Sequence, residues 1–310
     1  MRVSVILCTY SLDMYEHFRE AAESVLSQSY DDLELVVVVD GTEVVHERVI
    51  EDYGDHDDVV VHCNEENVGL LESRNTGAEL ASGDVVAFID DDAVADNEWV
   101  AALIDGYEEQ DALAVGGKMV PDWVASKPRF LPDEFYWLVG VTHRGFADGP
   151  GWVRNTFGSN ISFEMDVFLE LGGFDTEIGG RKGDANLQGG ETELCARLTA
   201  EYGEEVWYNP DAIVAHKVFD YRTELWWLID RAFWQGYSKR AMETLVPESG
   251  GEEGEFLGQL VTESVPGRVK GLVRSPSAAA VEQLVMLLVF TGCVGGGYVS
   301  GFANYRGGFI

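Results

Sequence analysis

The first 117 residues alternate short apolar runs with segments of helical spacing, and this alternation limits the fold more than any other feature. Apolar runs lie at residues 3–7, 33–39, 59–62, 85–89 and 112–117. Segments with helical spacing of apolar residues lie between them, at 15–27, 44–53, 73–80 and 97–109. This order predicts an α/β fold with a doubly wound, mostly parallel sheet. Such sheets bind ligands at the carboxyl ends of their strands, where Tyr10, Asp40 and residues 90–92 fall.

Three aspartates, Asp90, Asp91 and Asp92, directly follow the apolar run at 85–89. Carboxylates packed this closely resist ionising together, and a divalent cation would neutralise them. Oxygen ligands of this kind suit Mg²⁺ or Mn²⁺, which also bind diphosphates. The alternative is a solvated acidic turn in a very acidic protein.

The usual phosphate-binding loops are missing from the sequence. No G-x-G-x-x-G follows the first apolar run, where residues 8–11 read CTYS, and the chain contains no G-x-x-x-x-G-K-[ST]. A dinucleotide-binding site needs those glycines for a close approach to the pyrophosphate. The negative charge of a bound phosphate must therefore be neutralised in another way, and a metal ion held by residues 90–92 would neutralise it.

The charge of the chain excludes one class of partner. Asp and Glu total 55 against 21 Lys and Arg, a net charge of −34, whereas a nucleic-acid binder needs a basic footprint. The 8 Trp, 12 Tyr and 15 Phe argue against disorder and for a folded protein with an acidic surface, as is typical of a high-salt cytoplasm. The four cysteines form no C-x-x-C pair, which predicts reduced thiols rather than a zinc site or disulfides. No signal peptide precedes the first predicted strand.

The C-terminal third contains two segments suited to a membrane. Residues 223–242 predict an amphipathic helix in which aromatic residues lie beside Arg231, Lys239 and Arg240, and the alternative is ordinary packing on the N-terminal part of the protein. Residues 283–305 contain no charge and are long enough to span a bilayer. Their glycines weaken a helix, so a re-entrant segment, an interfacial segment and a buried hairpin stay open. Residues 248–256 predict an exposed acidic loop. The basic residues 268, 270 and 274 predict that the part of the chain before them lies on the cytoplasmic face of the membrane.

Eight short motifs occur in an order that resembles the family 2 glycosyltransferases, which have the GT-A fold. They are VSVILCTY (3–10), VVVDG (37–41), NVGLLESRNTG (67–77), GDVVAFIDDD (83–92), GSNISF (158–163), LGGFD (171–175), GETELCARL (190–198) and VAH (214–216). The resemblance covers residues 1–217. It implies a GT-A catalytic domain with a nucleotide-binding half (1–117) and an acceptor half (118–217). Residues 218–310 would then form a helical, membrane-associating extension.

The resemblance also implies roles for individual residues. The nucleotide-sugar would be bound by Thr9, Tyr10, Asp40, Arg74, Asp90 and Asp91, with Tyr10 and Asp40 at the uracil. Asp90, Asp92 and His216 would hold Mn²⁺ or Mg²⁺, and the alternative for His216 is a hydrogen-bonded core histidine. In the family, the catalytic base lies in an acidic segment at the start of a helix. The corresponding segment here, residues 190–194, has one carboxylate fewer. One register makes Glu191 the base and a shifted register makes it Glu193; the pair could also simply favour a helix N-terminus.

Residues 135–141 and 231–240 resemble the hexuronic-acid transferases of haloarchaeal N-glycosylation. The resemblance implies inverting transfer of a hexuronic acid, glucuronic acid first, from a UDP-sugar to a dolichyl-phosphate-linked monosaccharide in glycan assembly for surface-layer glycoprotein. An anionic sugar needs a cationic partner, and the candidates are Lys118, Arg144, Arg154, Arg181 and Lys182. The alternatives are transfer of a neutral hexose to dolichyl phosphate or its glycan, and a non-catalytic membrane subunit that binds nucleotide-sugars.

Overall fold

The computed structural model describes residues 1–178, 180–182, 185–245 and 257–304, and the predicted loop at 248–256 lies outside them. The chain divides into two compact units. Unit 1 comprises residues 1–121, 149–179 and 190–217, and unit 2 comprises 122–148, 180–189 and 218–310. The predicted boundary after residue 217 stays a prediction.

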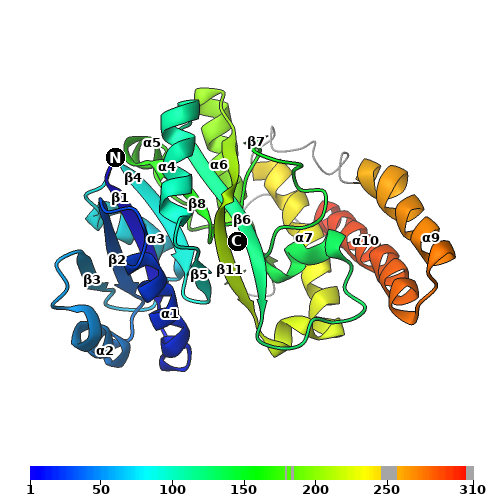
Figure 1. Ribbon diagram of the computed structural model, residues 1–310, viewed down its shortest axis with the longest axis horizontal. Coiled ribbons are helices and arrows are strands. Elements are labelled where there is room, and N and C mark those ends of the chain that lie inside the picture. Colours follow the sequence, from blue (N-terminus) through cyan, green and yellow to red (C-terminus); the bar gives the residue numbers. More distant parts are fainter. Residues whose placement is uncertain (179, 183–184, 246–256, 305–310) are drawn as a thin grey trace. The chain divides into compact units, whose positions relative to one another are not determined.

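The parallel half of the main sheet confirms the strand and helix alternation. Its strands run in the order β3-β2-β1-β4, and each of these neighbouring pairs is parallel. Apolar residues fill these strands because both faces of a parallel sheet are covered. The strands are β1 (Val3–Thr9), β2 (Leu33–Val39), β3 (Val59–Cys63) and β4 (Val85–Asp90), and the helices between them and after β4 are α1 (Tyr15–Leu26), α2 (Glu43–Tyr53), α3 (Leu70–Leu80) and α4 (Trp99–Gln110), with the short η1 (Leu12–Met14) before α1 (Figure 1).

Beyond β4 the sheet turns antiparallel. β8 runs antiparallel to both β4 and β6, and β11 runs antiparallel to β5 and β7. The helices α5 and α6 pack here against a core of aromatic and aliphatic side chains that includes Phe88, Phe168 and Leu194. The elements are β5 (Ala93–Ala95), β6 (Ala114–Trp123), β7 (Gly151–Val153), β8 (Ile161–Glu164), α5 (Met165–Glu170), α6 (Gly190–Tyr202) and β11 (Val206–Val218).

Unit 2 consists mainly of helices. The long α7 packs along α10, and α9 also contacts α10 (Figure 1). The elements are η2 (Asp133–Val139), β9 (Gly180–Lys182), β10 (Ala185–Leu187), η3 (Asp220–Thr223), α7 (Leu225–Leu245), the π-helical η5 (Leu260–Ser264), α9 (Val265–Arg274) and α10 (Ala278–Asn304).

The apolar C-terminal segment is one continuous helix, so the hairpin alternative is wrong. Two of its glycines, Gly297 and Gly301, face α7. A Cβ on Gly297 would lie 1.8 Å from the Phe233 carbonyl oxygen, and a Cβ on Gly236 of α7 would lie 1.9 Å from the Val294 carbonyl oxygen. Glycine therefore lets the two backbones touch, and the packing offsets its weak helix propensity. Among the described residues, Ala278–Phe302 is one helix that is long and apolar enough to cross a membrane.

Candidate active site

The carboxyl ends of β1 and β2 carry the first group of predicted site residues. Thr9 is buried and its hydroxyl donates to Asp91 Oδ2 over 3.0 Å. Tyr10 follows it and exposes 58% of its surface, so it is not part of the core. The Tyr10 carbonyl accepts a hydrogen bond from the Thr42 hydroxyl, which fixes the backbone at this edge. The Tyr10 ring thus has an open face on which a base could stack.

Asp40 is buried at the end of β2, and its carboxylate holds the loop before α3. Oδ1 accepts from the Asn64 amide and the Val68 N–H, and Oδ2 accepts from the Gly69 N–H. A carboxylate offers about two acceptor positions on each oxygen, so Oδ2 keeps one position for a further donor. Asp40 therefore positions this loop and still has capacity for one N–H of a base.

The aspartates after β4 and a histidine of β11 form a candidate metal centre. β11 pairs with β5 so that His216 lies opposite Ala93, and this register places His216 Nε2 3.3 Å from Asp92 Oδ1. Ligand atoms of Asp90, Asp92 and His216 all lie within 4.8 Å of one another. Two carboxylates and an imidazole at this spacing suit a divalent cation such as Mn²⁺.

Asp91, between the two candidate ligands, is strongly perturbed. Burial, followed by the negative charges of Asp92 and Asp90, raises the pKa of Asp91 to about 7. The Thr9 hydroxyl acts in the opposite direction by donating to the carboxylate. Burial and the crowding of like charge both disfavour the ionised carboxylate, and a bound cation would relieve the crowding.

Arg74 connects α3 to this acidic group. Its Nη2 donates to Asp90 Oδ1 over 2.5 Å, and its guanidinium lies 5.7 Å from the ring centroids of both Phe88 and Phe174. The side chain is buried, so its position is fixed by packing as well as by charge. Arg74 therefore holds the Asp90 carboxylate in place.

The two glutamates at the start of α6 differ in their surroundings. Glu193 is buried, and both of its oxygens accept from Arg197, at 2.7 Å from Nε and 2.7 Å from Nη2. Arg197 also donates to the carbonyls of Leu171 and Gly173. By contrast, a Cβ on Gly158 would lie 3.7 Å from Glu191 Oε2 and 2.9 Å from Arg74 Nη1. Glu191 is therefore the glutamate that lies near the Arg74–Asp90 pair.

Two residues of the GSNISF motif support the site, although the sequence patterns indicated no role for either of them. The Ser159 hydroxyl accepts the Asp90 backbone N–H over 3.0 Å. Asn160 accepts from the Trp99 indole and donates to the Lys118 and Ala212 carbonyls, which ties β6 to β11. The motif itself was the available signal, since a buried asparagine needs several partners.

The five candidate cations for an anionic sugar fall in different parts of the chain. Arg154 follows β7 in unit 1, and its charge acts on the buried Cys195 of α6 together with that of Glu191. Lys118 is an exposed residue of β6. The remaining three, Arg144, Arg181 and Lys182, belong to unit 2.

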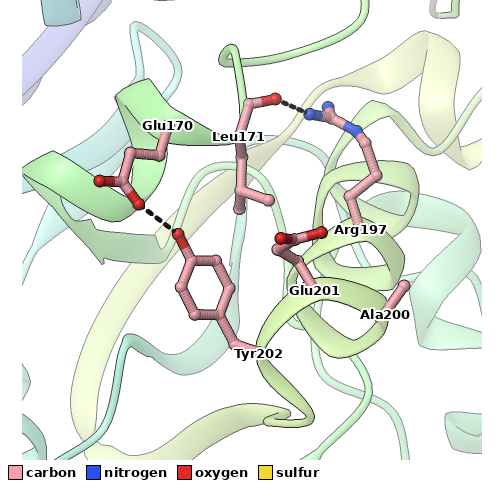
Figure 2. A pocket seen from close by; sticks show the side chains of 6 residues that line it. All are labelled: Glu170, Leu171, Arg197, Ala200, Glu201 and Tyr202. Atoms are coloured by element: carbon pink, nitrogen blue, oxygen red, sulfur yellow. Dashed lines mark hydrogen bonds between the residues drawn. The ribbon is translucent and has the colours of Figure 1, made fainter.

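A hollow beside α6 does not involve the predicted site residues. It has a volume of about 440 Å³, and two hydrogen bonds join residues that line it (Figure 2). Tyr202 donates to Glu170 over 2.7 Å, and Arg197 donates to the Leu171 carbonyl. These contacts brace the link between α5 and α6 rather than form a binding site.

The family described as "Glycosyl transferase family 2" matches residues 4–172. A Haloferax volcanii protein named "Glucosyl-dolichyl phosphate glucuronosyltransferase" is 56% identical over 302 residues, which is 97% of this chain and 96% of that protein.

Two solved structures share the fold at low sequence identity. One is a mannosyltransferase from Pyrobaculum calidifontis in complex with GDP-Man and Mn²⁺, with a TM-score of 0.61, 15% identity, and coverage of 97% of this chain and 87% of that one. The other is S. aureus TarS in complex with UDP-GlcNAc, with a TM-score of 0.57, 16% identity, and coverage of 95% and 82%. The predicted fold class is confirmed.

Proposed function

The chain belongs to glycosyl transferase family 2, and we propose that it transfers glucuronic acid from a UDP-sugar to glucosyl-dolichyl phosphate. The observation that carries this proposal is the near full-length match to the Haloferax protein of that name, at 56% identity. A match over 97% of the chain includes the acceptor half and the C-terminal helices as well as the nucleotide-binding half. The enzyme would act at the cytoplasmic face of a membrane, where its lipid-linked acceptor lies.

The donor would be bound at the carboxyl ends of β1, β2 and β4. The exposed ring of Tyr10 would stack on the uracil, and Asp40 Oδ2 would accept from the base. Arg74 would keep the Asp90 carboxylate oriented toward the diphosphate side of the site. Asp91, hydrogen-bonded to Thr9, would complete this acidic edge.

The diphosphate calls for positive charge, and the donor set fits a divalent cation. Asp90, Asp92 and His216 would hold Mn²⁺ or Mg²⁺, since their ligand atoms converge within 4.8 Å and combine oxygen with imidazole nitrogen. A bound cation would supply charge that stabilises the leaving diphosphate. The Asp92–His216 contact orients the imidazole toward the carboxylates.

Glu191 is the catalytic base in this proposal. An acceptor hydroxyl is a weak nucleophile at neutral pH, and a carboxylate within hydrogen-bond reach removes its proton as the bond to the sugar carbon forms. Glu193 is unsuited because Arg197 occupies both of its oxygens. A single displacement opposite the diphosphate inverts the anomeric configuration.

Arg154 is the cation that we assign to the sugar carboxylate. Its charge and that of Glu191 act on the same buried thiol of α6, which supports a position near the transfer site. An Arg pairs with a carboxylate through two parallel hydrogen bonds, so it selects a uronic acid over a neutral hexose. Arg154→Gln should lower the preference for UDP-glucuronic acid over UDP-glucose by about tenfold or more.

The test is transfer of labelled sugar to glucosyl-dolichyl phosphate in molar KCl with Mn²⁺. We expect label in the lipid phase from UDP-glucuronic acid and little from UDP-glucose or UDP-N-acetylglucosamine. Glu191→Gln should lower kcat by about 10²- to 10⁴-fold without loss of UDP binding. The matched control is Glu201→Gln, an exposed acid-to-amide change on the same helix.

Other outcomes separate the alternatives. Label from a neutral UDP-sugar alone would keep the enzyme class and refute the donor. Binding of UDP without transfer to any dolichyl acceptor would support the non-catalytic alternative. Full turnover by the Glu191→Gln variant would refute Glu191 as the base.

A further inference from the structure

The exposed side of α10 is apolar along its described length. Every exposed position between residues 278 and 302 is occupied by Ala, Gly or a large apolar residue, and these positions recur every three or four residues. Val285, Leu288, Val299 and Phe302 expose 51%, 58%, 68% and 60% of their surfaces. Spacing of this kind places them on one side of the helix. We call this set the α10 stripe: Ala278, Val281, Val285, Leu288, Gly292, Gly295, Gly296, Val299 and Phe302.

The opposite side of α10 is packed against protein. Leu287 and Phe290 are buried, and the Phe290 ring lies 5.4 Å from that of Phe135 in η2. Gly297 meets the α7 backbone at Phe233. Among the described residues, unit 2 covers one side of the helix and leaves the stripe exposed.

Both ends of α10 are held by charged residues of the same unit. Near the N-terminal end, Glu282 pairs with Arg129, whose carbonyl also accepts from Gln283. Near the C-terminal end, the Tyr298 hydroxyl donates to Glu243 over 2.8 Å, and the Arg240 guanidinium lies 3.8 Å from the Phe302 ring centroid.

These contacts argue against a helix that crosses the bilayer. A crossing would place the two ends of α10 on opposite sides of the membrane, although both ends contact one folded unit. The alternative is that Arg240, Glu243 and the rest of the α7 surface would enter hydrocarbon, where ionised side chains are strongly disfavoured. If the helix lies parallel to the membrane surface, the whole α10 stripe can contact lipid while both ends stay on one side of the membrane.

We propose that α10 lies flat in the headgroup region of a membrane and immerses the α10 stripe, so that the enzyme is held on one leaflet. The choice of a lipid surface as the partner rests on the proposed function, because its acceptor is carried on a lipid. Charge complementarity supports an anionic leaflet. In a chain of net charge −34, the exposed cations Lys270 and Arg274 lie on α9, which packs against α10.

Helix α9 continues the same kind of surface. Val269 and Val273 expose 44% and 79% of their surfaces and lie one turn apart, next to the two cations. Apolar residues flanked by Lys and Arg are the composition of helices that bind in the interfacial plane. Helix α9 therefore adds contacts with acyl chains and headgroups beside those of α10.

The first experiment measures vesicle binding by the full chain. The wild type should cosediment with vesicles of phosphatidylglycerol and phosphatidylcholine in molar KCl. The affinity for vesicles should fall by at least about tenfold in the double variant Val285→Asp/Leu288→Asp. The matched control is Val44→Asp, an equally exposed valine of α2 in unit 1, which should bind like the wild type. Unchanged circular dichroism and thermal unfolding would exclude misfolding of the double variant.

The second experiment distinguishes a flat helix from a crossing helix. Nitroxide labels at positions 281, 288 and 299 are placed in a chain whose partly exposed Cys63 and Cys293 are serine. A flat helix predicts nearly equal depths at the three positions. A crossing helix predicts a deep label at 288 with shallow labels at both ends, and this profile would overturn the proposal.

A third outcome concerns a second copy of this chain as the occupant. Light scattering without vesicles should give a monomer for both the wild type and the double variant. A dimer that the double variant converts to a monomer, with no vesicle binding, would overturn the proposal. If the wild type binds vesicles with equal label depths but transfers no sugar, the proposed function is refuted and the flat orientation of α10 is not.

Discussion

Replacing Glu193 by glutamine tests whether this residue is structural or catalytic. The change removes the negative charge and turns one acceptor oxygen into an NH₂ group that faces the Arg197 guanidinium. At least one of the two 2.7 Å hydrogen bonds is lost. Arg197 keeps its bonds to the Leu171 and Gly173 carbonyls, so its side chain stays in place with an unbalanced charge.

The magnitude follows from burial. Hydrogen bonds between charged partners contribute about 1.5–3 kcal/mol, and breaking a fully buried pair costs about 3–5 kcal/mol. The Glu193 side chain is 6% exposed and the Arg197 side chain is 28% exposed, so water partly solvates the remaining charge. We therefore expect a loss of about 2–3 kcal/mol in the free energy of unfolding, or roughly 4–12 °C in Tm.

The assay combines denaturant unfolding with kinetics well below Tm. Glu193→Gln should keep kcat within about threefold of the wild type, whereas Glu191→Gln should lose activity and keep its stability. Arg197→Met should lower stability by a similar amount, and the double variant should cost less than the sum. A Glu193→Gln variant that unfolds like the wild type and loses about a hundredfold in kcat would refute the reasoning. Glu193 would then be the base.

Three further predictions concern the metal, pH and helix packing. Asp92→Asn should lower Mn²⁺-dependent transfer by about 10²-fold, and Mn²⁺ titration followed by electron paramagnetic resonance should detect weaker binding; unchanged affinity would exclude Asp92 as a ligand. Burial, followed by the charge of Lys239, lowers the pKa of His143 to about 4, so the unfolded chain binds the proton first as pH falls from 6.5 toward 4. Stability should therefore drop by roughly 2–3 kcal/mol across that window, and His143→Gln should flatten the profile in urea unfolding. Gly297→Ile should lower Tm because its Cβ would lie 1.8 Å from a carbonyl oxygen of α7, at a cost of about 1–3 kcal/mol, whereas Val299→Ile on the exposed side should be neutral in thermal unfolding.

Much of the nucleotide-binding half could be predicted from local sequence patterns. Strand β2 occupies the predicted range, and β1 and β4 extend the predicted runs by one or two residues. Helix α3 begins three residues before its predicted start, after Gly69 with φ of 92°, because a glycine in the left-handed region redirects the chain into the helix. The run at 112–117 overlaps β6, whereas β5, β7, β8 and β11 had no clear signal, since their pairing partners are distant in sequence.

The candidate site also has one part that the sequence predicted and another part that required the folded structure. Asp90, Asp92 and His216 were identified as a set by motif order, although His216 lies more than a hundred residues from the aspartates. The choice between Glu191 and Glu193 depended on Arg197 and on the Leu171 and Gly173 carbonyls, which only a folded chain brings together. The role of Ser159 as acceptor of the Asp90 N–H likewise required the β4–β8 pairing.

Sequence alone determined the α/β class, the acidic edge of the sheet and the apolar C-terminal segment, because each depends on residues close together in the chain. Tertiary structure decided which glutamate pairs with Arg197, how His216 meets Asp92 and which side of α10 stays exposed among the described residues. The physical reason is that periodicity reports the intrinsic preference of a segment. Hydrogen-bond partners, burial and exposure depend on contacts between segments far apart in the chain.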